Sequence, residues 1–198
     1  MAARTIIILY FLLAICDGYC QEVSFFKEDL TFRIGGGYFH VNGTYFLRRS
    51  NPSDTSLVLF YPFPADTIYS KPDSVFIFNL NAGKEITGYH QSNRGILFRT
   101  SLDSVTALLI SYRQALRSNQ ARYILTTTQY WGRPLEQVTY RLITDGSLII
   151  TSFSYAPDRC ETFGDKKICY WEKEHFMPLK DMIFSFEYGQ EQSTKPEK

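Results

Sequence analysis

Short runs in which apolar and polar residues alternate, separated by turn-forming residues, recur along most of the chain. Val138, Tyr140 and Leu142 show the pattern most clearly, because polar residues alternate with them as in a half-buried strand. Glycine, proline and asparagine break the runs, for example at 35–37 and 51–54. No segment has a convincing helical period. The pattern predicts an all-β fold, an antiparallel β-sandwich of immunoglobulin-like or jelly-roll-like type.

The remaining strand-like runs are spread evenly, and no shift in composition marks a domain boundary. A single sandwich domain over 21–188 is therefore expected, followed by a polar tail at 189–198 that lacks large apolar residues. A weak similarity between 41–64 and 105–128 leaves open two packed sub-sandwiches. Outside the centre of the chain, strands are expected at 23–26, 30–34, 38–49, 57–61, 75–80, 85–89, 95–99, 138–142, 148–155, 168–171 and 182–188.

The stretch 104–135 contains two long strand-like runs joined by a polar loop. In the first run Leu108 and Ile110 share one face, and the opposite face is also apolar, as in a strand covered on both sides. In the second run Tyr123 and Leu125 share a face, and β-branched threonines follow. The two runs predict a long central β-hairpin in the middle of the sandwich.

The longest apolar run lies near the start of the sequence, at 6–15, after a single basic residue, Arg4. Ten residues rise about 15 Å as a helix, roughly half the hydrocarbon thickness of a bilayer. The run is therefore too short to span a membrane and is typical of a secretory signal peptide covering 1–20. A secreted or periplasmic protein with no transmembrane segment after cleavage is expected.

Small residues at Gly18 and Cys20 favour cleavage after Cys20, which would leave Gln21 as the new N-terminus. A lipoprotein acylated at Cys16 or Cys20 is an alternative, although bulky residues stand just before both cysteines. An uncleaved membrane anchor is a second alternative.

Cys160 and Cys169 lie close together and bracket a turn-like Gly164-Asp165 pair. In an exported chain, two such cysteines are most simply a disulfide across a hairpin. A metal site that includes His175 is the alternative, but the spacing matches no usual zinc pattern.

The charge balance and the short motifs exclude several function classes. With 21 basic and 20 acidic side chains the formal net charge is +1, which argues against nucleic-acid binding and against a strongly acidic partner. The glycines at 35–37 lack the Lys-Ser/Thr pair of a phosphate loop. No Gly-x-Ser-x-Gly is present, and His40, His90 and His175 are scattered. The sequence therefore assigns no catalytic residue, no cofactor and no metal.

Acidic residues gather around the cysteine pair and leave one enzymatic alternative open. A glycan or peptide hydrolase of the cell envelope could use two of them facing across a cleft. Because lysines alternate with them, a solvated face of mixed charge is favoured instead. The carboxylates concerned are Asp158, Glu161, Asp165, Glu172, Glu174 and Asp181.

Two features indicate partner binding. Arg113, Arg117 and Arg122 surround the tip of the expected hairpin, where forked donors could meet an anionic group. Trp131 belongs to a surplus of aromatic residues, and exposed aromatics hold sugars or protein partners on many sandwiches. The surplus comprises Tyr61, Tyr69, Tyr89, Tyr130, Trp131, Tyr155, Tyr170 and Trp171. The leading hypothesis is an exported, non-enzymatic β-sandwich that binds a protein or glycan of the cell envelope.

Several short motifs follow one another along the chain: Glu28-Asp29-Leu30, Val41, Tyr45-Phe46, Ser50-Asn51, Leu57, Phe60-Tyr61-Pro62-Phe63-Pro64, Tyr123-Ile124-Leu125-Thr126-Thr127, Trp131, Pro134-Leu135 and Phe176-Met177-Pro178. Taken in this order, they resemble a bacterial secreted family known only as a domain of unknown function. The similarity covers roughly 22–186 and departs from the family pattern at Arg48-Arg49 and in the placing of both cysteines around one hairpin. It implies export and a β fold, and it carries over no catalytic residue.

Overall fold

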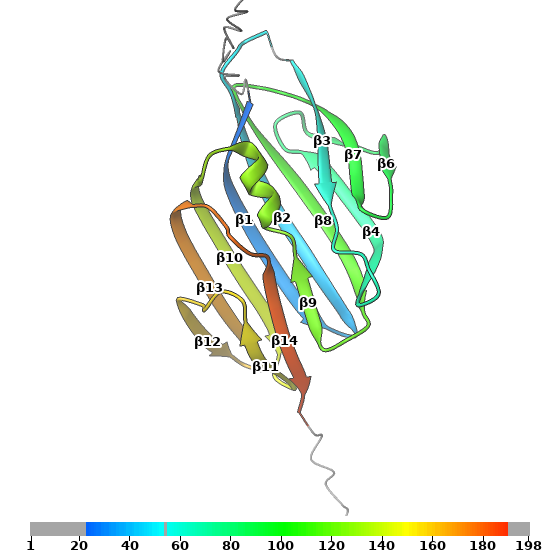
Figure 1. The fold of residues 1–198 in the computed structure, drawn as a ribbon, viewed down its shortest axis with the longest axis vertical. Helices are drawn as coiled ribbons and strands as arrows, with labels where there is room; N and C mark the ends of the chain where they lie inside the picture. Colours follow the sequence, from blue (N-terminus) through cyan, green and yellow to red (C-terminus); the bar gives the residue numbers. More distant parts are fainter. Residues whose placement is uncertain (1–22, 54, 190–198) are drawn as a thin grey trace, which may run out of the picture.

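The computed structural model describes residues 23–53 and 55–189, and strands dominate this part of the chain. The largest sheet has eight strands (Figure 1). In spatial order they are β12 (Arg159–Phe163), β13 (Lys166–Phe176), β10 (Leu135–Asp145), β1 (Val23–Gly35), β2 (Tyr38–Arg49), β8 (Val105–Leu116), β4 (Tyr69–Asn79) and β5 (Lys84–Glu85).

Two three-stranded sheets cover one face of the large sheet, so that the described residues form a β-sandwich with a divided second layer (Figure 1). The first small sheet contains β11 (Leu148–Phe153), β14 (Met182–Tyr188) and β9 (Gln120–Tyr123). The second contains β3 (Ser56–Pro62), β7 (Gly95–Ser101) and β6 (Tyr89–Gln91). A short 3₁₀ helix, η1 (Thr126–Trp131), lies on the same face. The predicted all-β sandwich is confirmed.

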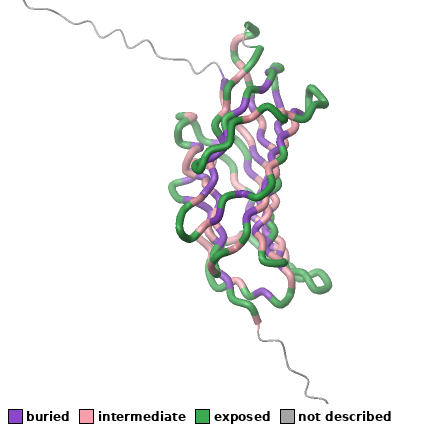
Figure 2. The backbone as a smooth tube through the Cα atoms, turned by 90° about the vertical axis from the view of Figure 1, so that its right-hand side faces the viewer, coloured by how far each residue is buried: buried purple, intermediate pink, exposed green. Residues whose placement is uncertain are grey.

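Strand β1 carries the residues that join the two layers. Residues along the strands alternate between buried and less buried positions, as the colours of the backbone in Figure 2 show, while most turns are exposed. Phe32 is completely buried, and its ring packs against Tyr123 of β9 and Phe184 of β14, each 5.3 Å away between ring centroids. The core therefore lies between the large sheet and the β11-β14-β9 sheet at this point, and it continues under β3 and β7 through Tyr61, Ile96 and Phe98.

A β-bulge in β1 decides which side chains of this strand face inward. The register with β2 shifts between Phe25 and Lys27. Before the shift the inward residues have odd numbers, and after it they have even numbers, beginning with Glu28 and Leu30. An extra residue in one strand moves every later side chain to the other face. The bulge thus turns a carboxyl group toward the core.

The predicted central hairpin is wrong, because its two strands lie in different sheets. Strand β8 pairs with β2 on one side and β4 on the other, so neither of its edges is left for the run that follows. The chain instead leaves the large sheet, and β9 pairs with β14 in the other layer.

The later part of the run that was expected to form the second hairpin strand forms the helix η1 instead. The carboxylate of Asp181 binds the start of this helix by accepting hydrogen bonds from the backbone N–H groups of Leu125 and Thr126, both at 3.1 Å. A carboxylate at these free amides stabilises a helical turn over an extended strand.

One pair of strands departs from the predicted antiparallel arrangement, since β1 and β10 are parallel. Parallel neighbours need a connection that crosses over the sheet. The segment that contains β9 and η1 makes this crossing, from β8 on one side of the β1–β2 pair to β10 on the other. The crossover places η1 over the large sheet, where it forms one wall of the pocket described below.

The predicted disulfide is present and joins Cys160 of β12 to Cys169 of β13 across a hairpin. Its turn contains Gly164, at a φ of 61° that glycine adopts without strain. The expected signal peptide at 1–20 lies outside the described residues, and so does the expected tail apart from Gly189. Among the described residues, no helix has the length and apolar character needed to cross a membrane.

Candidate functional site

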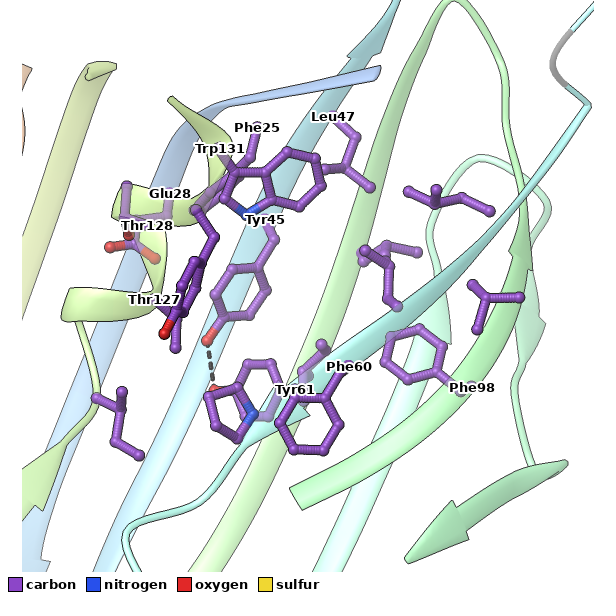
Figure 3. A pocket seen from close by; sticks show the side chains of 18 of the residues that line it. Phe25, Glu28, Tyr45, Leu47, Phe60, Tyr61, Phe98, Thr127, Thr128 and Trp131 are labelled. Carbon is purple, nitrogen blue, oxygen red and sulfur yellow. Dashed lines mark hydrogen bonds between the residues drawn. The ribbon is translucent and has the colours of Figure 1, made fainter. Parts of the chain in front are cut away.

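A large pocket opens where the second layer is divided. Its floor is formed by β1, β2 and β8 of the large sheet, and its two walls by β3 and η1 (Figure 3). The cavity volume is about 1380 Å³, above the roughly 300–1,000 Å³ of ordinary small-molecule sites. The pocket is therefore large enough for a ligand with a long body.

Apolar and aromatic side chains form most of the pocket lining. Leu108 and Ile110 of β8 are among the lining residues. Figure 3 shows Trp131 of η1 opposite Phe60 of β3. Tyr130 is 87% exposed, and Phe60 is 53% exposed. Large side chains that remain in contact with solvent at a pocket lined by apolar groups are typical of a binding site.

Three tyrosine hydroxyl groups meet inside the pocket. The Tyr45 hydroxyl is hydrogen bonded to that of Tyr61, at 2.7 Å, and to that of Tyr123, at 2.9 Å. Burial raises the pKa of all three phenols well above the usual range, so the hydroxyls stay protonated. Gly43 leaves the space for this cluster, because a Cβ atom there would clash with the Tyr45 hydroxyl.

Glu28 is the acidic residue of the pocket, and it is 1% exposed. The Tyr140 hydroxyl donates a hydrogen bond to its Oε1 atom. In the described part of the chain Oε2 has no hydrogen-bond partner, and Figure 3 shows Glu28 on the same side of the pocket as Tyr45 and Trp131. One carboxyl oxygen is thus fixed by Tyr140, while the other is not held by a hydrogen bond.

Burial is the main cause that raises the pKa of Glu28 from its ordinary 4.5 to about 7. The hydrogen bond from Tyr140 opposes this effect, and the negative charge of Asp29 adds to it. Among the described residues no lysine, arginine or histidine forms an ion pair with Glu28. A buried carboxyl group without a cation is unusual outside functional sites.

The four residues predicted to bind a partner are not brought together. Arg113 binds Asp73 with two hydrogen bonds of 2.8 and 3.0 Å. Arg122 donates to the buried Asp181, with Nε at 2.8 Å. Arg117 is exposed in the connection after β8. Trp131 is the one of the four that lines the large pocket. The guanidinium groups of Arg113 and Arg122 are therefore hydrogen bonded to carboxylates of the protein itself.

The aromatic surplus divides between core, surface and pocket. Trp171 is buried in the core, and its indole N–H donates to the carbonyl of Tyr155 at 2.9 Å. Tyr61, Tyr130 and Trp131 line the pocket. The half-buried members outside the pocket are Tyr69, Tyr89, Tyr155 and Tyr170.

None of the six carboxylates considered for hydrolysis lines the large pocket. Asp158 forms an ion pair with Lys173 and accepts a hydrogen bond from the backbone N–H of Glu172. Asp181 holds η1 and Arg122 in place. Cys160 and Cys169, the thiols of the alternative metal site, are joined in the disulfide. Within 23–53 and 55–189, no three His, Cys, Asp or Glu side chains are grouped as metal ligands.

Solved structures with a similar fold include two bacterial proteins. A candidate nutrient-binding protein of Legionella pneumophila is 10% identical, with a TM-score of 0.67 over 83% of this chain and 67% of that chain. An M1 zinc metallopeptidase mutant of Deinococcus radiodurans, bound to a Tyr-Ser-Ala substrate, is 11% identical, with a TM-score of 0.50. That match covers 83% of this chain and 43% of the peptidase, so this chain spans less than half of the peptidase's length. No protein-family model and no curated protein matches the sequence. At these identities the similarities show the fold alone.

Proposed function

We propose that the protein is an exported, non-enzymatic binding protein that holds an apolar ligand in the pocket between β3 and η1. The observation that carries the proposal is the pocket itself, about 1380 Å³ in volume and lined mainly by apolar and aromatic side chains around a small polar cluster. Sites that bind small molecules combine these features. The Legionella pneumophila protein of the same fold, with its candidate role in nutrient binding, accords with a binding function.

The lining favours an apolar ligand over the protein or glycan partner that the sequence indicates. A sugar needs several hydrogen-bonding groups along the site, whereas apolar and aromatic side chains form most of this lining, and the hydroxyls of Tyr45, Tyr61 and Tyr123 are hydrogen bonded to one another. The hydrolase alternative has no support in the pocket, because the six acidic residues considered for it lie elsewhere.

Export is supported by two features: the short apolar run at 6–15 and the disulfide between Cys160 and Cys169. Disulfides persist mainly in oxidising compartments. The cell envelope or the medium is therefore the proposed location.

The neutral fluorescent dye Nile red tests the pocket directly. The protein is expected to bind it with a rise and a blue shift in emission, because the dye would move from water into an apolar cavity. Thr127→Trp, which places an indole in the cavity, should weaken the binding by about tenfold or more.

Thr31→Trp is the matched control, because Thr31 is also half-buried but does not line the pocket. Fluorescence titrations of the three proteins, each checked for folding by circular dichroism, give the comparison. Equal dye binding by all three, or none by the wild type, would contradict the proposed function.

Export predicts that the full-length protein, expressed in a bacterium, is recovered from the periplasm or medium with an N-terminus near Gln21. N-terminal sequencing and intact mass measure this. Membrane-bound material that retains Met1 would argue for an uncleaved anchor instead.

A further inference from the structure

We propose that the pocket selects an amphiphilic amine, whose ammonium group binds at Glu28 and whose apolar body lies between β3 and η1. The inference rests on the proposed function and adds the chemical class of the ligand. It follows from three properties of this part of the pocket: an acid without an ion-pair partner, three neighbouring aromatic side chains in the same lining, and a lack of competing cations.

The first property is the missing partner of Glu28. The side chain is 1% exposed, Tyr140 occupies Oε1, and Oε2 has no hydrogen-bond partner within the described residues. A buried carboxylate is strongly destabilised unless a cation and hydrogen-bond donors compensate for the lost water. An ammonium group supplies both a positive charge and N–H donors to Oε2.

The second property is the aromatic surroundings of the acid. The Phe25 ring lies 6.0 Å from the ring of Tyr45 and 5.9 Å from that of Trp131, measured between centroids. All three residues line the pocket together with Glu28, and Figure 3 shows them on one side of it. Aromatic rings attract cations through the negative potential of their faces, and tryptophan does so most strongly.

The third property is the absence of competing positive charge around Glu28 among the described residues. The groups that interact with it electrostatically are Asp29 on its own strand and the tyrosines Tyr45, Tyr61, Tyr123 and Tyr140 on four other strands. Arg94, the basic residue of the pocket lining, is exposed. An anionic head group such as a carboxylate would meet the charge of Glu28 without a compensating cation.

Three ligands with the same alkyl chain and different head groups test the inference: decylamine, 1-decanol and decanoate. At pH 8 the amine is cationic and Glu28, with a pKa of about 7, is largely ionised. Decylamine is expected to displace Nile red at a concentration about tenfold lower than either of the other ligands, since a desolvated charge contact contributes an amount of this order. Calorimetric titration of each ligand without the dye gives an independent measurement.

Glu28→Gln keeps an acceptor for Tyr140 and removes the charge, so the preference for decylamine should fall to within about twofold. Asp29→Asn removes the same charge from the next residue of β1, whose side chain is half-buried and pairs with Lys27. This control should retain the tenfold preference.

The outcomes separate the two proposals. Binding of Nile red with equal displacement by the three ligands, or a preference for decanoate, would overturn the amine site and leave the binding function in place. Retention of the amine preference in Glu28→Gln would also overturn it. No binding of dye or alkyl ligand in either assay would overturn both proposals.

Discussion

Glu28→Gln is expected to raise the free energy of unfolding by about 2–3 kcal/mol at a pH of about 9, and to change it little at a pH of about 4. A polar substitution at a completely buried position normally destabilises a protein. The opposite sign is expected here because the folded protein holds the carboxyl group in surroundings that disfavour its charge.

The pH dependence follows from the two pKa values. Below the ordinary value of 4.5 the carboxyl group is protonated in the folded and the unfolded state, and its charge costs nothing. Between 4.5 and about 7 the unfolded chain releases the proton while the folded protein keeps it, so stability falls as the pH rises. Above about 7 the carboxyl group of Glu28 is ionised in the folded protein as well. The loss in the free energy of unfolding then stays constant at about 3 kcal/mol, since each pH unit between the two pKa values contributes about 1.4 kcal/mol.

Urea denaturation of both proteins at the two pH values measures this difference. Asp29→Asn should change the free energy of unfolding by no more than about 0.5 kcal/mol at either pH, as is usual for a partly exposed ion pair. A loss of stability in Glu28→Gln at high pH would show that the carboxylate is a structural group. A gain of stability would show that the charge of Glu28 destabilises the folded protein, as the charges of binding and catalytic residues often do.

The strands could be predicted from the sequence wherever one face is buried, because burial imposes a period of two. The alternation of Val138, Tyr140 and Leu142 corresponds to inward positions of β10, and the expected strand at 182–188 coincides with β14. Strand pairing could not be predicted in the same way. Whether β8 and β9 form a hairpin depends on whether β8 has a free edge, and distant strands occupy both of its edges.

The helix η1 was missed for a similar reason. Its start is bound by Asp181, which lies 55 residues away from Thr126 in the sequence, and no local pattern shows this contact. The placement of Trp131 as a pocket residue depends on this helix. Of the predicted binding residues, only Trp131 lies in the pocket; in the charged pairs of Arg113 and Arg122, the partners come from other strands or loops.

A signal for Glu28 was present in the sequence. Counting back in steps of two from Ile34 gives Phe32, Leu30 and then Glu28, which places an acid in the apolar register of one strand. Phe26 would continue this even-numbered register in the sequence, so the bulge between Phe25 and Lys27, which buries Phe25 instead, could be found only in the structure. A charged residue in such a register indicates a functional group or a buried ion pair. The pocket that decides between the two could not be predicted, because its walls come from separate strands and η1.

Phe32→Ala is expected to lower the free energy of unfolding by about 4 kcal/mol, the largest loss predicted for a single truncation in this protein. The Phe32 ring is completely buried in the middle of β1. It contacts rings of its own layer, Phe39 and Tyr140, and rings of the opposite layer, Tyr123 and Phe184. Its removal leaves a cavity between the layers and ends four aromatic contacts.

Phe163→Ala removes the same side chain from the β12–β13 hairpin, where Phe163 is 80% exposed, and should cost about 0.5 kcal/mol or less. Urea denaturation curves of both variants and the wild type provide the comparison. Similar losses from the two substitutions would contradict the arrangement of the layers described above. A large loss confined to Phe32→Ala would show that β1 joins the two layers; the residues of 104–135 that were expected in the core, Leu108, Ile110, Tyr123 and Leu125, are also buried. The same strand would then hold the core through Phe32 and present Glu28 to the pocket.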